Sequence, residues 1–285
     1  MPRKIRSVLI IANVGKTGAH SLAEEIQAVL TGRGVSVRLF EYEGVAHEVT
    51  GKNGHDLAIT LGGDGTVLFA SRVLAGSDTP ILPVNLGDFG FISEVGHDEW
   101  LPAYESFVSG EIEAGPRLVL VVSVFRDGKE ICLFRGLNDA VVSSEGISRM
   151  VRLDVRLTEQ PIGRYRADGV IVATPTGSTA YSAAAGGPIL HPEMSAMILN
   201  PICPFTLSHR PIVLPEDEEI NITVDPGQRT NVALTVDGQS LTSLFPGDLV
   251  TVRADRRRAF IVRSDRRNFY EVLRNKLRWS GEASD

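Results

Sequence analysis

Two patterns of apolar and polar positions divide the chain. Over about the first hundred residues, short apolar runs such as 8–12 alternate with segments whose apolar residues recur every three or four positions. The runs are typical of buried strands, and the spacing of Leu22, Ile26 and Leu30 places these side chains on one face of a helix. Strands that alternate with helices predict a mostly parallel, doubly wound, Rossmann-like α/β sheet.

Local signals set the expected ends of the elements in this half. Ser21 and Glu24 have the spacing of a capping box, so we expect a helix that begins near Leu22. Gly32 and Gly34 then supply the residue type that commonly ends a helix. The other elements predicted here are strands at 35–40, 56–61 and 81–85, and a helix that opens near Thr66.

From about Leu118 the apolar residues alternate with polar ones, and turn signals follow at short intervals. Asp127-Gly128 lies between two such segments and predicts a tight hairpin. Many short strands of this kind are typical of a sandwich-like all-β domain. Strands are predicted at 118–125, 131–135, 151–157, 220–224, 232–236, 248–253 and 260–263, and an amphipathic helix over 268–279.

The change of pattern predicts an α/β domain followed by a β-rich domain. We assign residues 1–112 to the N-terminal α/β domain and 113–265 to the C-terminal β-rich domain. A helix at about 266–280 is expected to pack back on the first domain. With 285 residues, of which 43% are hydrophobic, the chain is long enough to bury a substantial core.

Composition argues against several classes of protein. No apolar run approaches the ~20 residues needed to cross a bilayer, and no secretory cleavage site follows the first residues, so we expect a cytoplasmic protein. The net charge of −6 argues against a nucleic-acid binder, and the six histidines show no metal-ligand spacing. Cys132 and Cys203, both flanked by apolar residues, are expected as buried, reduced thiols.

Three glycines surround one carboxylate where a predicted strand meets the following helix. Glycines turn tightly and expose backbone N–H groups, which bind anions at the positive end of a helix. Gly62, Gly63, Gly65 and Thr66 therefore form a candidate phosphate loop. Asp64 would repel phosphate, so it points to magnesium binding or to removal of a proton from an attacking hydroxyl. The alternative is an ordinary tight turn in which this Asp accepts local hydrogen bonds.

A second candidate site begins at Asp168. Residues 168–173 have the apolar character of a buried strand and run into a cluster of hydroxyl side chains that ends at Tyr181. Hydroxyl groups can bond ribose or phosphate oxygens, the small residues at 183–187 permit close approach, and a tyrosine offers a flat apolar ring. This composition suits a nucleotide. The alternative is a Ser/Thr-rich turn that caps a helix.

Taken together, these segments resemble the NAD kinase family. The resemblance is carried by residues 62–66, 85–91, 137–139 and 168–188, with further agreement at 201–211 and 237–239. The first segment alone identifies only the superfamily that NAD kinases share with diacylglycerol, sphingosine and 6-phosphofructo-type kinases. The segment 168–188 is specific to NAD kinases and decides the assignment.

The resemblance implies an N-terminal α/β domain and a C-terminal β-rich domain, with NAD bound in the cleft between them. It implies transfer of the terminal phosphoryl group of ATP to the 2′-hydroxyl of the adenosine ribose of NAD, which gives NADP. Magnesium is the implied divalent cofactor, held mainly through the donor phosphates with no assigned protein ligands. Within the family, a threonine at the place of Thr66 is associated with use of inorganic polyphosphate as well as ATP.

The resemblance also implies roles for individual residues. Asp64 accepts or aligns the proton of the attacking hydroxyl. Contacts with NAD fall to Gly65, Asn138, Asp139, Arg166, Asp168, Thr176, Thr179, Ala180, Tyr181 and Gln239. Many relatives have Glu at the place of Asp139, and they commonly have an uncharged residue at the place of Asp88. Because Asp168 corresponds to a residue that often meets the nicotinamide end across a subunit interface, a homodimer or homotetramer is expected.

Some alternatives stay open at the level of sequence. A lipid or sphingoid kinase would share the glycine loop, although no membrane-binding stretch supports it. A nucleotide sensor would bind NAD or NADPH without turnover. His209, beside Arg210, lies either near the ligand or in a structural position, and Arg166 serves either an anionic group of the ligand or a strand surface.

Overall fold

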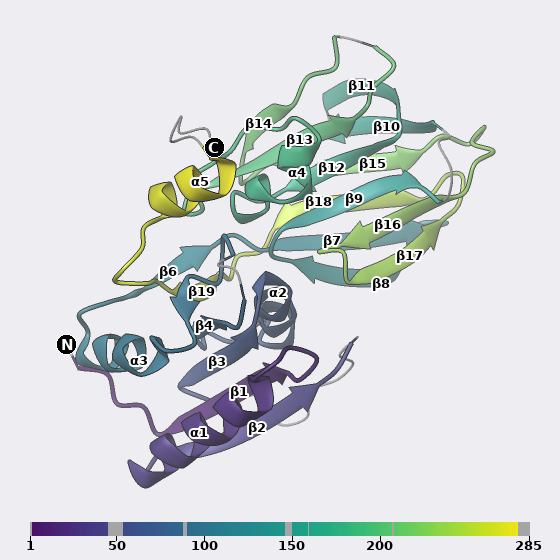
Figure 1. Cartoon of the computed structure of the whole chain (residues 1–285). Coiled ribbons are helices and arrows are strands. Elements are labelled where there is room, and N and C mark those ends of the chain that lie inside the picture. Colours follow the sequence, from purple (N-terminus) through teal and green to yellow (C-terminus); the bar gives the residue numbers. More distant parts are fainter. Residues whose placement is uncertain are drawn as a thin grey trace. The chain divides into compact units, whose positions relative to one another are not determined.

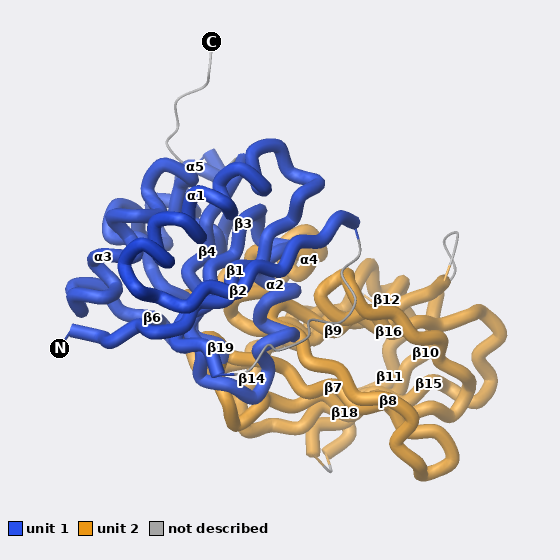
Figure 2. Tube along the Cα trace, turned by 90° about the horizontal axis from the view of Figure 1, so that it is seen from below, with its two compact units in different colours: residues 1–116, 259–285 blue, residues 117–258 orange. Residues whose placement is uncertain are grey.

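The computed structural model describes residues 2–44, 54–87, 90–145, 150–158, 160–206 and 208–278. Internal contacts divide the chain into two compact units, residues 1–116 with 259–285 and residues 117–258 (Figure 2). The second unit is one continuous segment, whereas the first is built from both ends of the chain. That residues 1–112 and 113–265 form separate folding domains remains a prediction.

The first unit contains a seven-stranded sheet with the order β2-β1-β3-β4-β19-β6, and β5 pairs with β4 (Figure 1). The pairs β1·β2, β1·β3, β3·β4, β4·β5 and β4·β19 are all parallel. The strands are β1 (Ser7–Asn13), β2 (Ser36–Tyr42), β3 (Leu57–Gly62), β4 (Ile81–Asn85), β5 (Val95–Gly96), β6 (Ala114–Arg117) and β19 (Ala259–Val262). The helices are α1 (Ala19–Gly32), α2 (Asp64–Val73), α3 (Trp100–Ser109) and α5 (Phe269–Leu277).

The central strands of this sheet are buried on both faces. Every residue of β3 and of β4 is buried, as expected for parallel strands with both faces covered. The apolar face of α1, formed by Leu22, Ile26 and Leu30, packs in one core cluster with Val8 and Leu57 of the sheet. The predicted α/β fold of this half is therefore confirmed.

Two helices begin earlier than the sequence predicts. α1 starts at Ala19, and Ser21 lies inside its first turn, where the hydroxyl donates to the carbonyl oxygen of Gly18 at 3.1 Å. The predicted capping box is wrong because Gly18, at φ 82°, lets the chain enter the helix without a side-chain cap. α2 starts at Asp64 and not near Thr66, so the carboxylate belongs to the helix itself.

The second unit contains two antiparallel sheets. Their orders are β11-β10-β15-β18-β7-β8 and β14-β13-β12-β9-β16-β17. The first sheet contains β7 (Leu120–Arg126), β8 (Lys129–Gly136), β10 (Val151–Leu157), β11 (Gln160–Ala167), β15 (Ile220–Val224) and β18 (Leu249–Ala254). The second contains β9 (Asp139–Ser144), β12 (Gly169–Ala173), β13 (Ala196–Ile202), β14 (Ile212–Pro215), β16 (Val232–Val236) and β17 (Ser240–Leu244). A 3₁₀ turn (Thr176–Thr179) and the short helix α4 (Tyr181–Ala184) follow β12.

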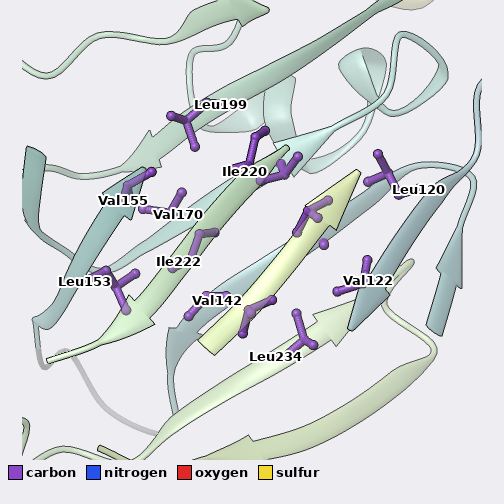
Figure 3. Packing of buried hydrophobic residues seen from close by; sticks show 14 of the residues in the cluster. Leu120, Val122, Val142, Leu153, Val155, Val170, Leu199, Ile220, Ile222 and Leu234 are labelled. Atoms are coloured by element: carbon purple, nitrogen blue, oxygen red, sulfur yellow. The ribbon is translucent and has the colours of Figure 1, made fainter. Parts of the chain in front are cut away.

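One core holds the two sheets together. Figure 3 shows Val122 and Leu153 from the first sheet and Val142 and Leu234 from the second in the same cluster of side chains. All four are almost fully buried, so alternate residues of both sheets supply the apolar interior of a sandwich. The predicted β-rich, sandwich-like half is confirmed.

Turn chemistry was a reliable signal in this unit. Asp127 and Gly128 have φ of 50° and 73° and join β7 to β8 with Arg126 opposite Lys129. Positive φ at both residues is what a type I′ two-residue hairpin turn requires, and Asp-Gly adopts it readily. The predicted hairpin is confirmed.

Two other expectations from the sequence are wrong. Residues 260–263 were grouped with the strands of the β-rich half, but β19 pairs with β4, and Val262 lies in the core of the first unit. A short apolar run does not reveal its partner strand. Cys203 was expected to be buried, yet it is exposed after the end of β13, whereas Cys132 is partly buried against the core of the second unit. Among the described residues, no helix has the length and apolar character of a membrane span.

Candidate functional site

The glycine loop of the first unit is a tight junction between β3 and α2. The carbonyl oxygen of Gly62 accepts from the N–H of Leu86 at 2.9 Å, and Gly63 is the N-cap residue of α2. A Cβ at Gly62 would overlap the side chain of Thr66, so this position requires glycine. Thr66 itself is buried, and its hydroxyl accepts from the hydroxyl of Tyr42 at 3.3 Å.

The carboxylate of Asp64 is wrapped by the segment 90–93. Its Oδ1 accepts from the N–H of Ile92 (3.3 Å) and from both the N–H (2.9 Å) and the hydroxyl (2.7 Å) of Ser93. Its Oδ2 accepts from the N–H of Phe91 at 2.9 Å. A Cβ at Gly90 would overlap the carboxylate, which explains glycine there. Asp64 is thus held in one orientation by donors that are far from it in sequence.

Ser93 belongs to this site although no sequence motif pointed to it. It is fully buried, and its hydroxyl also accepts from Nδ2 of Asn85 at 3.1 Å. The Oδ1 atom of Asn85 accepts from the N–H of Gly87 at 2.8 Å. The available signal was a hydroxyl residue that closely follows the segment 85–91. Two residues of that segment, Asp88 and Phe89, lie outside the described residues.

In the second unit, Asp237 organises the segment 137–139. Its carboxylate accepts from the N–H groups of Leu137 (2.8 Å), Asn138 (2.7 Å) and Asp139 (3.2 Å). Asp237 has φ 53° in the turn after β16, and its own N–H donates to the carbonyl oxygen of Asp139 at 3.0 Å. Two segments singled out in the sequence, 137–139 and 237–239, are therefore adjacent.

The hydroxyl-rich segment joins the same place. The N–H of Thr174 donates to the carbonyl oxygen of Asn138 at 2.8 Å, and its hydroxyl donates to that of Leu137 at 2.6 Å. The N–H of Gly177 donates to the hydroxyl of Thr174 at 3.0 Å, and a Cβ at Gly177 would overlap the backbone of Asn138. The backbone contact at this glycine brings Thr176 next to the segment 137–139.

Two buried polar atoms at this junction have no hydrogen-bond partner in the part of the chain that the structure describes. Oδ1 of Asn138 and the hydroxyl of Thr176 are buried without a hydrogen-bond partner among the described residues. The carboxyl of Asp139 is 5% exposed, and burial, with a smaller effect of the nearby Asp237 charge, raises its pKa to about 7. Buried polar groups are normally hydrogen-bonded, so unpartnered ones gathered in one place are typical of a ligand site.

Comparison with known proteins decides the family. Sequence models of the N-terminal and C-terminal domains of ATP-NAD kinase match residues 42–112 and 137–264. An NAD kinase from Treponema denticola is 41% identical over 280 residues, which cover 98% of this chain and 99% of that protein. The chain belongs to the NAD kinase family. An NAD kinase from Geobacter sulfurreducens is 39% identical over 284 residues, which cover 96% of this chain and 99% of that protein.

Solved structures of the NAD kinase family share the fold. Yeast NADH kinase complexed with NADH aligns with a TM-score of 0.86 and 27% identity over 99% of this chain and 90% of that one. An NAD kinase from Archaeoglobus fulgidus in complex with ATP aligns with a TM-score of 0.75 and 26% identity over 97% and 100% of the two chains. The predicted family and fold class are confirmed.

The remaining residues predicted from the NAD kinase resemblance lie at several places in the second unit. Tyr181, 48% exposed, opens α4, and the hydroxyl of Thr179 donates to the carbonyl oxygen of Thr176 at 3.1 Å. The guanidinium of Arg166 lies 5.2 Å from the ring centre of Phe205. Asp168 and Ala180 are half-buried, and Gln239 is exposed. Contacts of these side chains with a ligand stay a prediction.

His209 packs its ring against Tyr165 with 4.4 Å between ring centres, and its Nδ1 is buried without a partner among the described residues. Within that same part of the chain, no group of three or more His, Cys, Asp or Glu side chains could hold a metal ion.

Proposed function

We propose that this chain transfers the terminal phosphoryl group of ATP to the 2′-hydroxyl of the adenosine ribose of NAD, which yields NADP. The observation that carries the proposal is the carboxylate of Asp64, fixed by hydrogen bonds at the first residue of the helix that follows the glycine loop. Membership of the NAD kinase family supplies the identity of the two substrates.

The arrangement around Asp64 suits activation of a hydroxyl. A secondary hydroxyl is a weak nucleophile, and a positioned carboxylate can align it and accept its proton. From the described residues, Oδ1 accepts three hydrogen bonds, whereas Oδ2 accepts one, from Phe91. Each carboxylate oxygen has about two acceptor sites, so we assign the ribose hydroxyl to Oδ2 of Asp64.

The glycine loop is proposed to face the phosphates of the substrates. Gly63 and Gly65 flank Asp64 at the N-terminal end of α2, where backbone N–H groups and the helix dipole favour anions. Gly62 and Thr66 contribute differently, because both are buried and Gly62 gives room for the Thr66 side chain. A role of Thr66 in the use of polyphosphate would therefore act through the shape of the loop.

Recognition of NAD is proposed for the second unit. Oδ1 of Asn138 and the hydroxyl of Thr176 are buried without partners among the described residues, and the carboxyl of Asp139 is also buried. With a pKa of about 7, the carboxyl of Asp139 is partly protonated near neutral pH, so it can donate as well as accept a hydrogen bond. The exposed ring of Tyr181 is suited to stack on a base. Arg166, Asp168, Thr179, Ala180 and Gln239 complete the proposed set, with Gly65 from the glycine loop.

Magnesium and subunit assembly complete the proposal. Magnesium is proposed to bind mainly through the donor phosphates, with at most one or two carboxylates of the protein. When bound, such an ion neutralises the charge of the phosphates during transfer. A homodimer or homotetramer is proposed because Asp168 corresponds to a residue that meets the nicotinamide end across a subunit interface in many relatives.

The test is formation of NADP by the purified chain. We expect NAD, magnesium and ATP to give NADP, detected with an NADP-specific dehydrogenase, and a parallel reaction with inorganic polyphosphate tests the donor range. Asp64→Asn should lower kcat by at least a hundredfold and leave NAD binding, measured by calorimetry, within threefold of the unaltered chain. If the folded chain binds NAD but forms no NADP with either donor, the proposed kinase activity is wrong and a nucleotide sensor is favoured.

A further inference from the structure

Ser93 contacts the proposed catalytic carboxylate through both its backbone and its side chain. The described residues donate four hydrogen bonds to the carboxylate of Asp64, and Ser93 donates two of them, one from its N–H and one from its hydroxyl. It is fully buried and follows the segment 90–92, which wraps the same carboxylate. We propose that Ser93 is a positioning residue for phosphoryl transfer, which holds Asp64 so that Oδ2 stays available to the substrate hydroxyl. This inference rests on the function proposed above.

The direction of the hydroxyl hydrogen bond is fixed by Asn85. Nδ2 of Asn85 donates to the hydroxyl of Ser93 at 3.1 Å and to its carbonyl oxygen at 3.3 Å. An amide nitrogen can only donate, and a carboxylate can only accept. The serine hydroxyl therefore accepts from Asn85 and must direct its single hydrogen to Oδ1 of Asp64, 2.7 Å away.

Asn85 connects this chain of hydrogen bonds to the rigid part of the unit. It is the last residue of β4, it is 3% exposed, and it pairs in register with Gly62 at the end of β3. The positions of Asp64 and Ser93 are therefore set by two adjacent central strands. Sites built on such strands hold their side chains more precisely than sites on loops alone.

Loss of the hydroxyl should affect the reaction step and not substrate binding. Without this hydroxyl, Oδ1 of Asp64 keeps two backbone donors among the described residues, and the carboxylate is held less firmly. Ser93 is buried, so water does not readily replace the missing donor. A hydrogen bond to a charged group is strong enough for its loss to lower kcat by about 10- to 100-fold. KM for NAD and for ATP should stay within about twofold, because the proposed role acts only through Asp64.

The experiment measures kcat and KM of S93A and of the matched pair S93T and S93V. S93T keeps the hydroxyl, whereas S93V has nearly the same shape without it, so S93T should exceed S93V in kcat by about tenfold. S77A is the matched control, since the hydroxyl of Ser77 donates to the carbonyl oxygen of Leu74 at 2.9 Å, in the turn after α2. We expect S77A to keep kcat within twofold. Thermal unfolding of each variant shows that it is folded.

A double-mutant cycle separates positioning from a general structural effect. If Ser93 acts through Asp64, then S93A should cause no further loss of the residual rate in the D64N background. Equal losses in both backgrounds, a kcat of S93A within twofold of the unaltered chain, or equal kcat for S93T and S93V would each overturn the proposal. Failure of the proposed function has a different appearance, because then the unaltered chain itself forms no NADP.

Discussion

At the scale of single residues, the carboxylates of Asp237, in the turn after β16, and of Asp139, at the start of the paired strand β9, have opposite surroundings. Asp237 accepts three backbone N–H groups, which stabilise a charged carboxylate. The side chain of Asp139, at the start of the neighbouring strand β9, is buried. Its pKa therefore rises to about 7, first through burial and then through the charge of Asp237. Asp139 is proposed to contact NAD. With a pKa of about 7, its carboxyl is partly protonated near neutral pH and can donate a hydrogen bond.

The raised pKa of Asp139 predicts how Asp139→Asn changes stability. Between the ordinary pKa of 3.8 and about 7, the folded chain binds more protons than the unfolded chain at this carboxyl. Stability from this group is therefore lost as pH rises through that window and stays lost above it. We expect D139N to be more stable than the unaltered chain at pH 8.5, by on the order of 1 kcal/mol, with a smaller difference at pH 5. Urea unfolding at both pH values measures this.

A surface carboxylate supplies the control for this prediction. Asp154 is 42% exposed and pairs with Arg164 at 3.4 Å on β10 and β11. D154N should change stability by less than about 0.5 kcal/mol at either pH. A D139N chain that is less stable than the unaltered chain at pH 8.5 would show that the carboxyl is charged and stabilised there.

At the scale of elements, the features that could be predicted from the sequence are those that depend on residues close together in the chain. The Asp127-Gly128 hairpin and the end of α1 at Gly32 follow from turn chemistry and helix stops, which are local. Ser93 could not be assigned to Asp64, because the contact depends on residues 29 positions apart in the chain. The partner strand of β19 was missed for the same reason, since β4 lies far away in sequence.

Gly177 offers a prediction about how elements meet. An added Cβ there would overlap the backbone of Asn138, which cannot move aside like a flexible side chain. We expect Gly177→Ala to destabilise the chain by about 1–3 kcal/mol and to raise KM for NAD severalfold, because the segment that carries Thr176 must shift. Urea unfolding and NADP formation measure the two effects. G32A is the control, since no described atom lies within 4 Å of a Cβ at Gly32. A G177A chain as stable as G32A would refute the packing argument.

At the scale of the complete chain, the first unit is built from two stretches that are far apart in sequence, 1–116 and 259–285. A cluster of charges joins these two stretches within the unit. Glu99, the residue before α3, accepts from Arg267 at 2.6 and 3.0 Å and from Arg266 at 3.3 Å. Hydrogen bonds from Arg267, with smaller effects of the backbone and of Arg266, lower the pKa of Glu99 to about 2. The segment just before α5 is thereby tied to a helix more than 160 positions earlier.

Glu99→Gln should weaken the attachment of the C-terminal segment. We expect a loss of about 1–3 kcal/mol in stability at pH 7, since hydrogen bonds to charged groups have this magnitude, and severalfold faster trypsin cleavage after Arg267 or Arg274. For the unaltered chain, this contribution is present above pH 4.5 and is lost as pH falls toward about 2. E105Q is the control, because Glu105 on α3 forms an exposed pair with Arg33 at 2.8 Å, which is worth little. If E99Q and E105Q were cleaved at the same rate, the ion pairs of Glu99 would not be what holds the segment before α5 in place.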